Sequence, residues 1–293
     1  MYAFSATHPA VLLLYYAAVL LITMFTAHPV LLAISLLCSV GFYAWLERPR
    51  VFVRQLAFSA VLFLLIALSN PLFSHNGATP LFFLNGHPIT REAVLCGMNI
   101  AAMLMAALYW FRCCHQTLTS EKWLYLFGRI TPKLALLLSS ALRFIPLLRR
   151  QAQTIRAAQK AMGLYSSRNY IERVKSSMHV FSALITWSLE NAIDTGASMK
   201  ARGYGLKHRS HFSLFRFSKR DAVMLALVLI LCGATLLGAL VQRPAFVFYP
   251  QVSSVAVDAR AIMGYAAYVA LCSLPLITEG KERAQWTYYR SKM

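Results

Sequence analysis

The chain has 293 residues, of which 58% are hydrophobic and 13% are charged, and its formal net charge is +19 at pH 7. Soluble domains carry about 25% charged residues, and the apolar residues here are gathered in blocks, so the composition excludes an ordinary soluble protein and indicates a membrane protein. Positive charge beside membrane spans is explained by Lys and Arg in cytoplasmic loops, which argues against nucleic-acid binding.

Six apolar segments each approach the ~20 residues that a helix needs to cross a bilayer. In chain order they are 10–27, 29–46, 52–70, 93–112, 221–242 and 260–278. The sequence therefore predicts an all-α, polytopic membrane protein with about six transmembrane helices. We expect three parts: spans one to four within 1–113, a cytoplasmic or interfacial helical region at 114–220, and spans five and six with a short tail at 221–293.

The distribution of basic residues predicts the orientation of the spans. Three of the 29 Lys and Arg residues lie in alternate loops, and the other 26 lie in the loop 47–54, in 112–220 or in the tail. Because cytoplasmic loops collect Lys and Arg, both termini and the long insert of a multi-pass protein are predicted to be cytoplasmic.

An external loop near 78–92 contains Asn85-Gly86 between two apolar runs. This dipeptide is a strong signal of a β-hairpin. We expect an ordered cap over the membrane helices in preference to a ligand site.

The basic insert is predicted to be helical. Residues 134–148 are too few to span and contain Arg143 and Pro146, which indicates an interfacial or re-entrant helix that kinks at the proline. The next helix, 147–162, is amphipathic. Its basic stripe is formed by Arg149, Gln153, Arg156 and Lys160, and its opposite stripe by Leu148, Ala152, Ile155 and Met162.

A second long helix is predicted over 171–201. It and the preceding helix both run into a small-x-Gly element, Ala161-Met162-Gly163 in the first case and Ala201-Arg202-Gly203 in the second. Glycine just past the last helical residue is typical of a helix end. The repetition of this element is the sharpest internal signal in the sequence.

Arg202 has two interpretations at such a position. A cation at a helix C-terminus interacts favourably with the helix dipole, which is a structural role. Alternatively, its planar guanidinium binds carboxylates of a partner, which Arg does better than Lys, and Gly203 permits close approach of the backbone. The residues alone leave both open. Glu190 and Asp194 are expected to pair with basic neighbours and support the helices, in preference to a catalytic dyad.

Other chemistry finds little support in the sequence. It contains no H-E-x-x-H, no G-x-S-x-G and no Walker-type glycine loop. The six cysteines form no C-x-x-C pair, so neither a zinc site nor a disulfide framework is predicted. We expect no enzymatic activity, no cofactor and no bound metal.

Two stretches resemble the transmembrane T component of energy-coupling factor (ECF) transporters, which includes the membrane subunit of cobalt permeases (EcfT and CbiQ). The first runs from Pro132 to Gly163, with Leu142-Arg143-Phe144-Ile145-Pro146 at its centre. The second runs from Ser188 to Tyr204. The resemblance covers most of the chain.

The resemblance implies a non-catalytic scaffold of an ATP-driven importer for a vitamin or a transition-metal ion, located in the cell (inner) membrane of a bacterium or archaeon. Its long coupling helices would end in Ala-Arg-Gly-like elements that dock onto two ATP-binding-cassette ATPases. A separate small membrane protein, the S subunit, would bind the substrate, and the scaffold would transmit ATP-driven motion to it through the bilayer.

The chain departs from the family pattern at the first element, where Met162 stands in place of the usual arginine. Either this dock is weaker, or Lys160 and Arg156 supply its charge, or Met162 packs into an adapted groove. The resemblance thus assigns ATPase coupling to the two elements with Lys160 and Arg156, and support to Arg143, Pro146, Glu190 and Asp194. The alternative function is a stand-alone multi-spanning carrier or channel, which the lack of acidic residues in mid-span disfavours.

Overall fold

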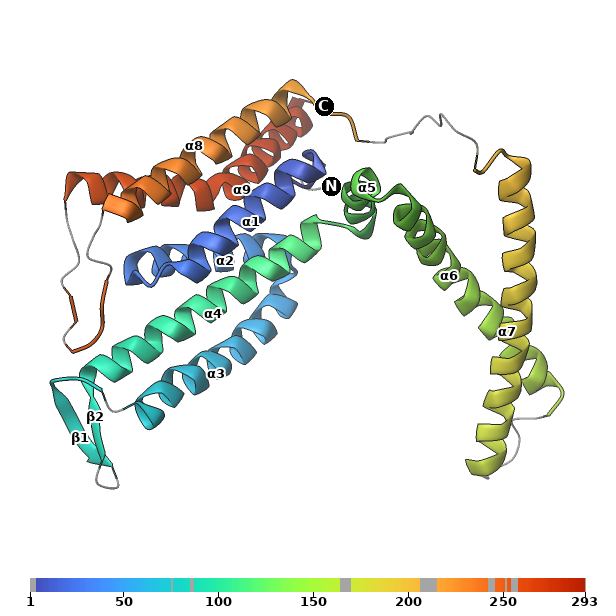
Figure 1. Cartoon of the computed structure of the whole chain (residues 1–293), viewed down its shortest axis with the longest axis horizontal. Coiled ribbons are helices and arrows are strands. Elements are labelled where there is room, and N and C mark those ends of the chain that lie inside the picture. The colour runs from blue at the N-terminus through green and yellow to red at the C-terminus, as the bar shows by residue number, and fades with distance from the viewer. Residues whose placement is uncertain are drawn as a thin grey trace. The chain divides into compact units, whose positions relative to one another are not determined.

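A computed structural model of the chain describes residues 4–74, 76–84, 87–163, 170–205, 215–241, 246–250, 252–253 and 258–292. Its contacts divide the chain into two compact units (Figure 1). The membrane unit comprises Met1–Trp123 and Phe215–Met293, and the insert unit comprises Leu124–Leu214.

The membrane unit contains a helix at each of the six predicted spans. They are α1 (Pro9–Phe25), α2 (Pro29–Leu46), α3 (Pro49–Phe73), α4 (Arg91–Thr117), α8 (Lys219–Val241) and α9 (Ala259–Lys292). Five are long and apolar enough to cross a membrane, and α1 is a shorter apolar helix of 17 residues. The prediction of an all-α, polytopic membrane protein is confirmed. Proline begins each of the first three helices, where its fixed φ suits the helix and its missing N–H costs nothing.

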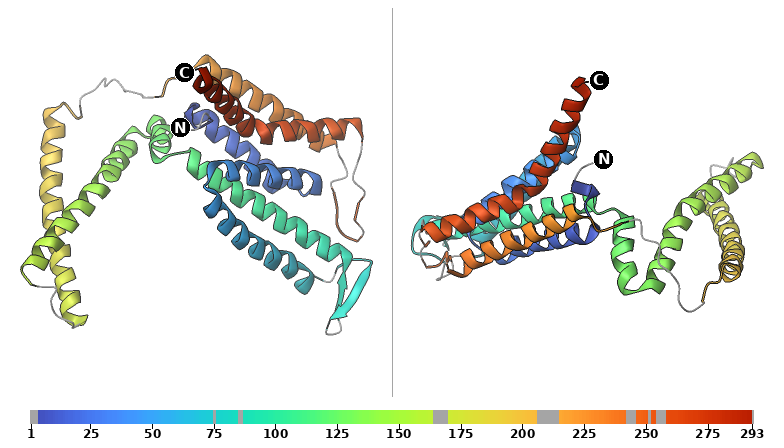
Figure 2. Two further views of the ribbon diagram at one scale, coloured as in Figure 1. Left: turned by 180° about the vertical axis from the view of Figure 1, so that it is seen from behind. Right: turned by 90° about the horizontal axis from the view of Figure 1, so that it is seen from above.

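The helices of this unit pack around an aromatic core. Helix α4 lies against α1, α2 and α3, while α9 lies against α2 and α8, as Figures 1 and 2 show. Among the largest fully buried side chains are Trp110, Tyr15, Tyr16, Tyr43 and Tyr268. Their polar atoms find partners inside the bundle, as hydrocarbon surroundings require.

One such polar cluster joins four helices. The Ser35 hydroxyl of α2 accepts from Trp110 Nε1 of α4 at 3.0 Å and lies 2.9 Å from the Thr23 hydroxyl of α1. The Thr23 oxygen is also 3.0 Å from the Tyr268 hydroxyl of α9. Interhelical hydrogen bonds of this kind help to hold membrane helices together.

Glycines let two helix pairs approach closely. A Cβ added at Gly97 of α4 would lie 2.4 Å from the Ala67 carbonyl oxygen of α3. A Cβ added at Gly238 of α8 would lie 2.9 Å from the Gly264 Cα of α9. Small residues at helix crossings are the usual means of close packing in a bilayer.

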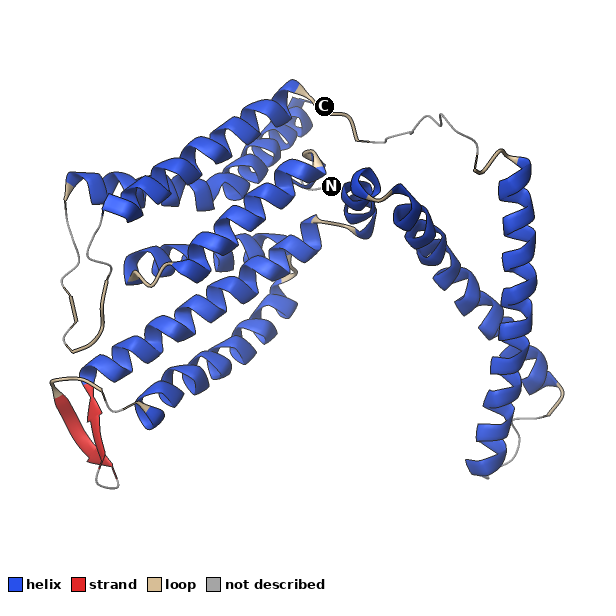
Figure 3. Ribbon diagram, in the orientation of Figure 1, coloured by secondary structure: helices blue, strands red, loops and turns tan. Residues whose placement is uncertain are grey.

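The predicted hairpin is confirmed as two antiparallel strands, β1 (Pro80–Leu84) and β2 (His87–Thr90), coloured red in Figure 3. The dipeptide 85–86 lies outside the described residues. Glu92 at the start of α4 accepts a hydrogen bond from the Thr79 hydroxyl at 2.7 Å. The Ala78 N–H donates to the Pro250 carbonyl at 3.2 Å, which attaches the hairpin to the connection between α8 and α9.

The opposite end of the membrane unit carries what we term the N-terminal clasp, formed by segment 4–8 with Lys122, Asp221 and Glu279. Glu279 of α9 accepts the first N–H of the segment at 2.9 Å, and Asp221 of α8 accepts the last at 3.0 Å. Lys122 donates from Nζ to a carbonyl between them, and burial lowers the pKa of this amine. The clasp thus joins α8, α9 and the first turn of α5 (Ser120–Ile130), which contains Lys122.

The insert unit is built from α5 (Ser120–Ile130), which begins at the boundary of the membrane unit, α6 (Pro132–Ala161) and α7 (Tyr170–Ala201). The predicted helix 171–201 is confirmed. The prediction of separate helices at 134–148 and 147–162 is wrong, because α6 continues through Pro146. A proline removes one backbone hydrogen bond of a helix, and here the helix continues on both sides of it. Helix α5 was not predicted.

Helices α6 and α7 pack against each other in the middle of their lengths. The Phe144 and Trp187 rings are stacked, with centroids 5.9 Å apart and planes inclined by 16°. Gln159 of α6 and Val180 of α7 are buried in the same unit. The pair therefore forms a crossed support that carries both small-x-Gly elements.

Candidate functional site

The end of α7 is a complete Schellman motif. The Gly203 N–H donates to the Lys200 carbonyl at 3.0 Å, and the Tyr204 N–H donates to the Met199 carbonyl at 3.0 Å. Gly203 has φ +81°, the left-handed conformation that glycine adopts without a steric cost. The residue at the cap, Arg202, is thereby held at a fixed turn of the backbone.

The end of α6 repeats this geometry. The Gly163 N–H donates to the Lys160 carbonyl at 3.1 Å, and the Met162 N–H donates to the Ala158 carbonyl at 3.1 Å. Gly163 has φ +80°. Both glycines are confirmed as helix ends, and the repetition seen in the sequence is also a repetition of backbone conformation.

The side chains at both helix ends are exposed. Met162 is 69% exposed, and Arg202 is also exposed. Ala161 and Ala201 are exposed as well, and a Cβ added at Gly163 would meet no atom within 4 Å. Each helix end is thus available to a partner, and the coupling role of these residues stays a prediction.

The predicted amphipathic face of α6 is present in the structure. Leu148, Ala152 and Ile155 are half-buried, and the basic stripe on the other side is exposed. The exposed residues of that stripe are Arg149, Gln153, Arg156 and Lys160. The charge of this helix therefore faces outward, beside the Met162 end.

A second exposed feature, which we term the α7 stripe, was not predicted as a surface. It consists of large apolar side chains at spacings of three and four residues: Ile171, Val174, Met178, Phe181, Ile185, Leu189 and Ile193. Such spacing places them on one side of a helix. Val180 and the half-buried Trp187 lie on the other side, where α7 meets α6. The signal was readable from the same helical periodicity.

The residues predicted to give structural support lie on the surface of the insert unit. Arg143 and Pro146 of α6 are exposed, as are Glu190 and Asp194 of α7. Their role stays a prediction. Within the described part of the chain, no group of three or more His, Cys, Asp or Glu residues is placed to hold a metal ion.

Known proteins are similar to this chain in amino-acid sequence. The sequence profile of the cobalt transport protein family, CbiQ, matches residues 5–212. The chain is similar to the energy-coupling factor transporter transmembrane protein EcfT of Bacillus selenitireducens, with 29% identity over 74% of this chain and 86% of the relative. It is 37% identical to EcfT of Listeria innocua over 34% of this chain and 39% of the relative. It is 35% identical to EcfT of Lactobacillus helveticus over 36% of this chain and 39% of the relative.

Proposed function

We propose that this chain, which belongs to the CbiQ cobalt transport protein family and is a transmembrane component of the energy-coupling factor class, couples ATP hydrolysis by partner subunits to substrate uptake. In this proposal it is a non-catalytic scaffold in the cell membrane, with both termini in the cytoplasm. Two ABC-type ATPases bind the insert unit, and a separate S subunit binds the vitamin or transition-metal ion.

The observation that carries the proposal is the pair of matching helix ends. Two long helices, packed through Phe144 and Trp187, each end in a left-handed glycine that presents one exposed side chain. Two similar ends suit two similar partner subunits. Backbone hydrogen bonds hold each end rigidly on its helix. Movement of a bound partner would therefore move the helix itself, with no flexible loop between them to absorb the displacement.

The charge of the insert supports an acidic partner groove. Arg156 and Lys160 lie exposed on the last turns of α6, and Arg202 caps α7. A guanidinium forms strong, charge-assisted hydrogen bonds with carboxylates. We therefore expect the ATPase surface that receives Arg202 to be lined by carboxylates.

The α7 stripe supports contact with a second, apolar partner. Exposed apolar surface that is continuous along a helix usually marks a protein or membrane contact. Within the proposed function, the α7 stripe is the surface that contacts the S subunit and the surrounding lipid as the helices move.

Affinity purification of the tagged chain in mild detergent tests the proposal. We expect two ATPase subunits to copurify with it, and the purified complex to hydrolyse ATP. The alternative of a stand-alone carrier predicts that the chain purifies alone and moves substrate in liposomes without ATP, and either result would contradict our proposal.

The orientation is tested separately by cysteine labelling in intact cells, in a background from which the six native cysteines have been removed. A cysteine at Asn85 should react with an impermeant thiol reagent, and one at Ser210 should not. Labelling at Ser210 alone would contradict the predicted orientation. It would not bear on the coupling role, which the purification experiment tests.

A further inference from the structure

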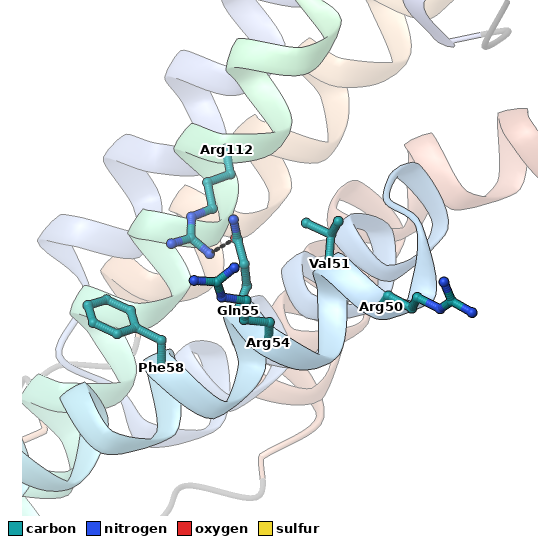
Figure 4. A pocket seen from close by; sticks show the side chains of 6 residues that line it. All are labelled: Arg50, Val51, Arg54, Gln55, Phe58 and Arg112. Carbon is teal, nitrogen blue, oxygen red and sulfur yellow. Dashed lines mark hydrogen bonds between the residues drawn. The ribbon is translucent and has the colours of Figure 1, made fainter.

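A cavity in the membrane unit has no role in the proposed function. It opens between α3 and α4, near the connection of α2 to α3, and has a volume of about 640 Å³ (Figure 4). Its lining residues are Arg50, Val51, Arg54, Gln55, Phe58 and Arg112. Arg54 and Arg112 lie close to Gln55, and Arg50 lies on the far side of Val51.

The lining carries three positive charges and no carboxylate. Arg50 and Arg54 lie one turn apart on α3, and Arg112 extends from α4. Glu47, in the same corner of the unit, accepts hydrogen bonds from the Gln116 side chain and the Arg48 N–H. Because like charges held together raise the free energy of the site, an anion in the cavity would be bound favourably.

Arg112 is held in place from two sides. Its guanidinium donates to the Gln55 side-chain oxygen, which also accepts from the Tyr43 hydroxyl at 2.7 Å. The guanidinium carbon lies 5.8 Å from the Tyr43 ring centroid and 5.6 Å from that of Tyr109, within cation–π range. A ligand therefore meets a cation whose position is already fixed, which lowers the entropic cost of binding.

The cavity continues into an apolar surface along α3. Phe58 is 66% exposed and lies two turns beyond Arg50, about 12 Å along the helix axis. Farther along α3, exposed apolar side chains follow at helical spacing: Val61, Leu65, Leu68 and Leu72. The apolar window of α3 is also the least buried of the five candidate spans.

We propose that this cavity is a binding site for an anionic phospholipid, with the phosphate on Arg54 and Arg112, Arg50 adding positive charge at the rim, and the acyl chains along Phe58 and the apolar face of α3. Arginine binds phosphate oxygens through several N–H groups at once. Basic pockets between transmembrane helices bind the head groups of such lipids on the cytoplasmic side of membranes. Soluble phosphate has the same oxygens, but it does not use the apolar surface that adjoins them.

Native mass spectrometry of the delipidated full-length chain in detergent tests this site. The probes are phosphatidylglycerol, phosphatidylcholine and inorganic phosphate, added one at a time. We expect one phosphatidylglycerol to bind at least tenfold more tightly than phosphatidylcholine. The double variant Arg50→Gln/Arg54→Gln should weaken phosphatidylglycerol binding about 25-fold, since a loss of about 1 kcal/mol at each arginine that lines the site corresponds to roughly fivefold.

The control is Arg48→Gln, which removes one positive charge from the same corner of the unit but does not line the cavity, so its effect is compared with the roughly fivefold loss expected for one lining arginine. It should change the affinity less than twofold, while all variants keep the thermal unfolding midpoint of the unaltered chain. Equal binding of the two lipids, equal weakening by Arg48→Gln, or displacement of phosphatidylglycerol by millimolar phosphate would each overturn the proposal. ATPase copurification does not enter this measurement, so its outcome is independent of the coupling role.

Discussion

The ends of α6 and α7 share one backbone conformation and differ in the side chain that it presents. Gly163 and Gly203 have φ of +80° and +81°, and each donates its N–H to the carbonyl three residues earlier. At the cap, however, α6 presents Met162 and α7 presents Arg202, and both are exposed. The comparison separates two properties of a docking element: the backbone sets where a side chain is held, and the side chain sets what it can bind.

The difference predicts unequal contacts with the two proposed ATPases. An exposed guanidinium gains from paired carboxylates, and removing it would leave them desolvated and unpaired. A methionine gains only from the apolar area that it buries. We therefore expect the α7 end to contribute more to coupling than the α6 end.

The largest expected effect follows from Arg202→Glu. Loss of a charge-assisted contact at a desolvated interface costs about 2–5 kcal/mol, which is enough to abolish coupled uptake. We expect ATPase copurification to fall to background at matched membrane levels, while the membrane unit remains folded.

Lys200→Glu is the control for Arg202→Glu. It makes the same change of charge in the last turn of α7, on a different side of the helix. The interaction of either residue with the helix dipole is only about 0.3–1 kcal/mol, so the control should retain most ATPase binding. Equal losses in the two variants would mean that Arg202 serves the helix end and does not dock.

An intermediate effect is expected from alanine at the two glycines. A residue with a Cβ costs about 1–2 kcal/mol in the left-handed conformation, so Gly163→Ala and Gly203→Ala should loosen their helix ends equally. ATPase copurification should fall several-fold for Gly203→Ala and less for Gly163→Ala. A larger loss for Gly163→Ala would reverse our ranking of the two ends.

An effect similar to or smaller than that of the glycine variants is expected at Met162. Met162→Ala removes only apolar contact and should cost about 1–2 kcal/mol, provided that the side chain is packed in the complex. Met162→Arg, which restores the family's usual residue, should copurify with ATPases within twofold of the unaltered chain. If Met162→Ala loses more ATPase than Arg202→Glu, the proposed asymmetry is wrong.

Features of the fold that depend on a local sequence pattern could be predicted from the sequence. The six membrane helices follow from the lengths of their apolar runs, and the hairpin follows from Asn85-Gly86. The helix ends at Gly163 and Gly203 follow from the role of glycine past a last helical turn. Each of these signals is local, so the residues that carry it lie close together in the sequence.

Other features depend on contacts that no local pattern contains. Helix α5 is only 11 residues long and includes charged side chains, so its apolar positions do not stand out from the basic insert. The continuation of α6 through Pro146 depends on packing as well as on local preference. The cavity at Arg112 requires that α3 and α4 pair, which no local pattern predicts. In the sequence, the arginines of the loop 47–54 indicate only the orientation of the chain.

The N-terminal clasp joins residues that are synthesised at very different times. Segment 4–8 leaves the ribosome well before its partners Asp221 and Glu279, which lie 213 and 275 residues later in the sequence than the residues they bind. At about 5–20 residues per second, these partners are made roughly 10–55 seconds after the segment. Segment 4–8 must therefore remain without these partners until α9 has been synthesised, so the clasp closes only late in the synthesis of the membrane unit.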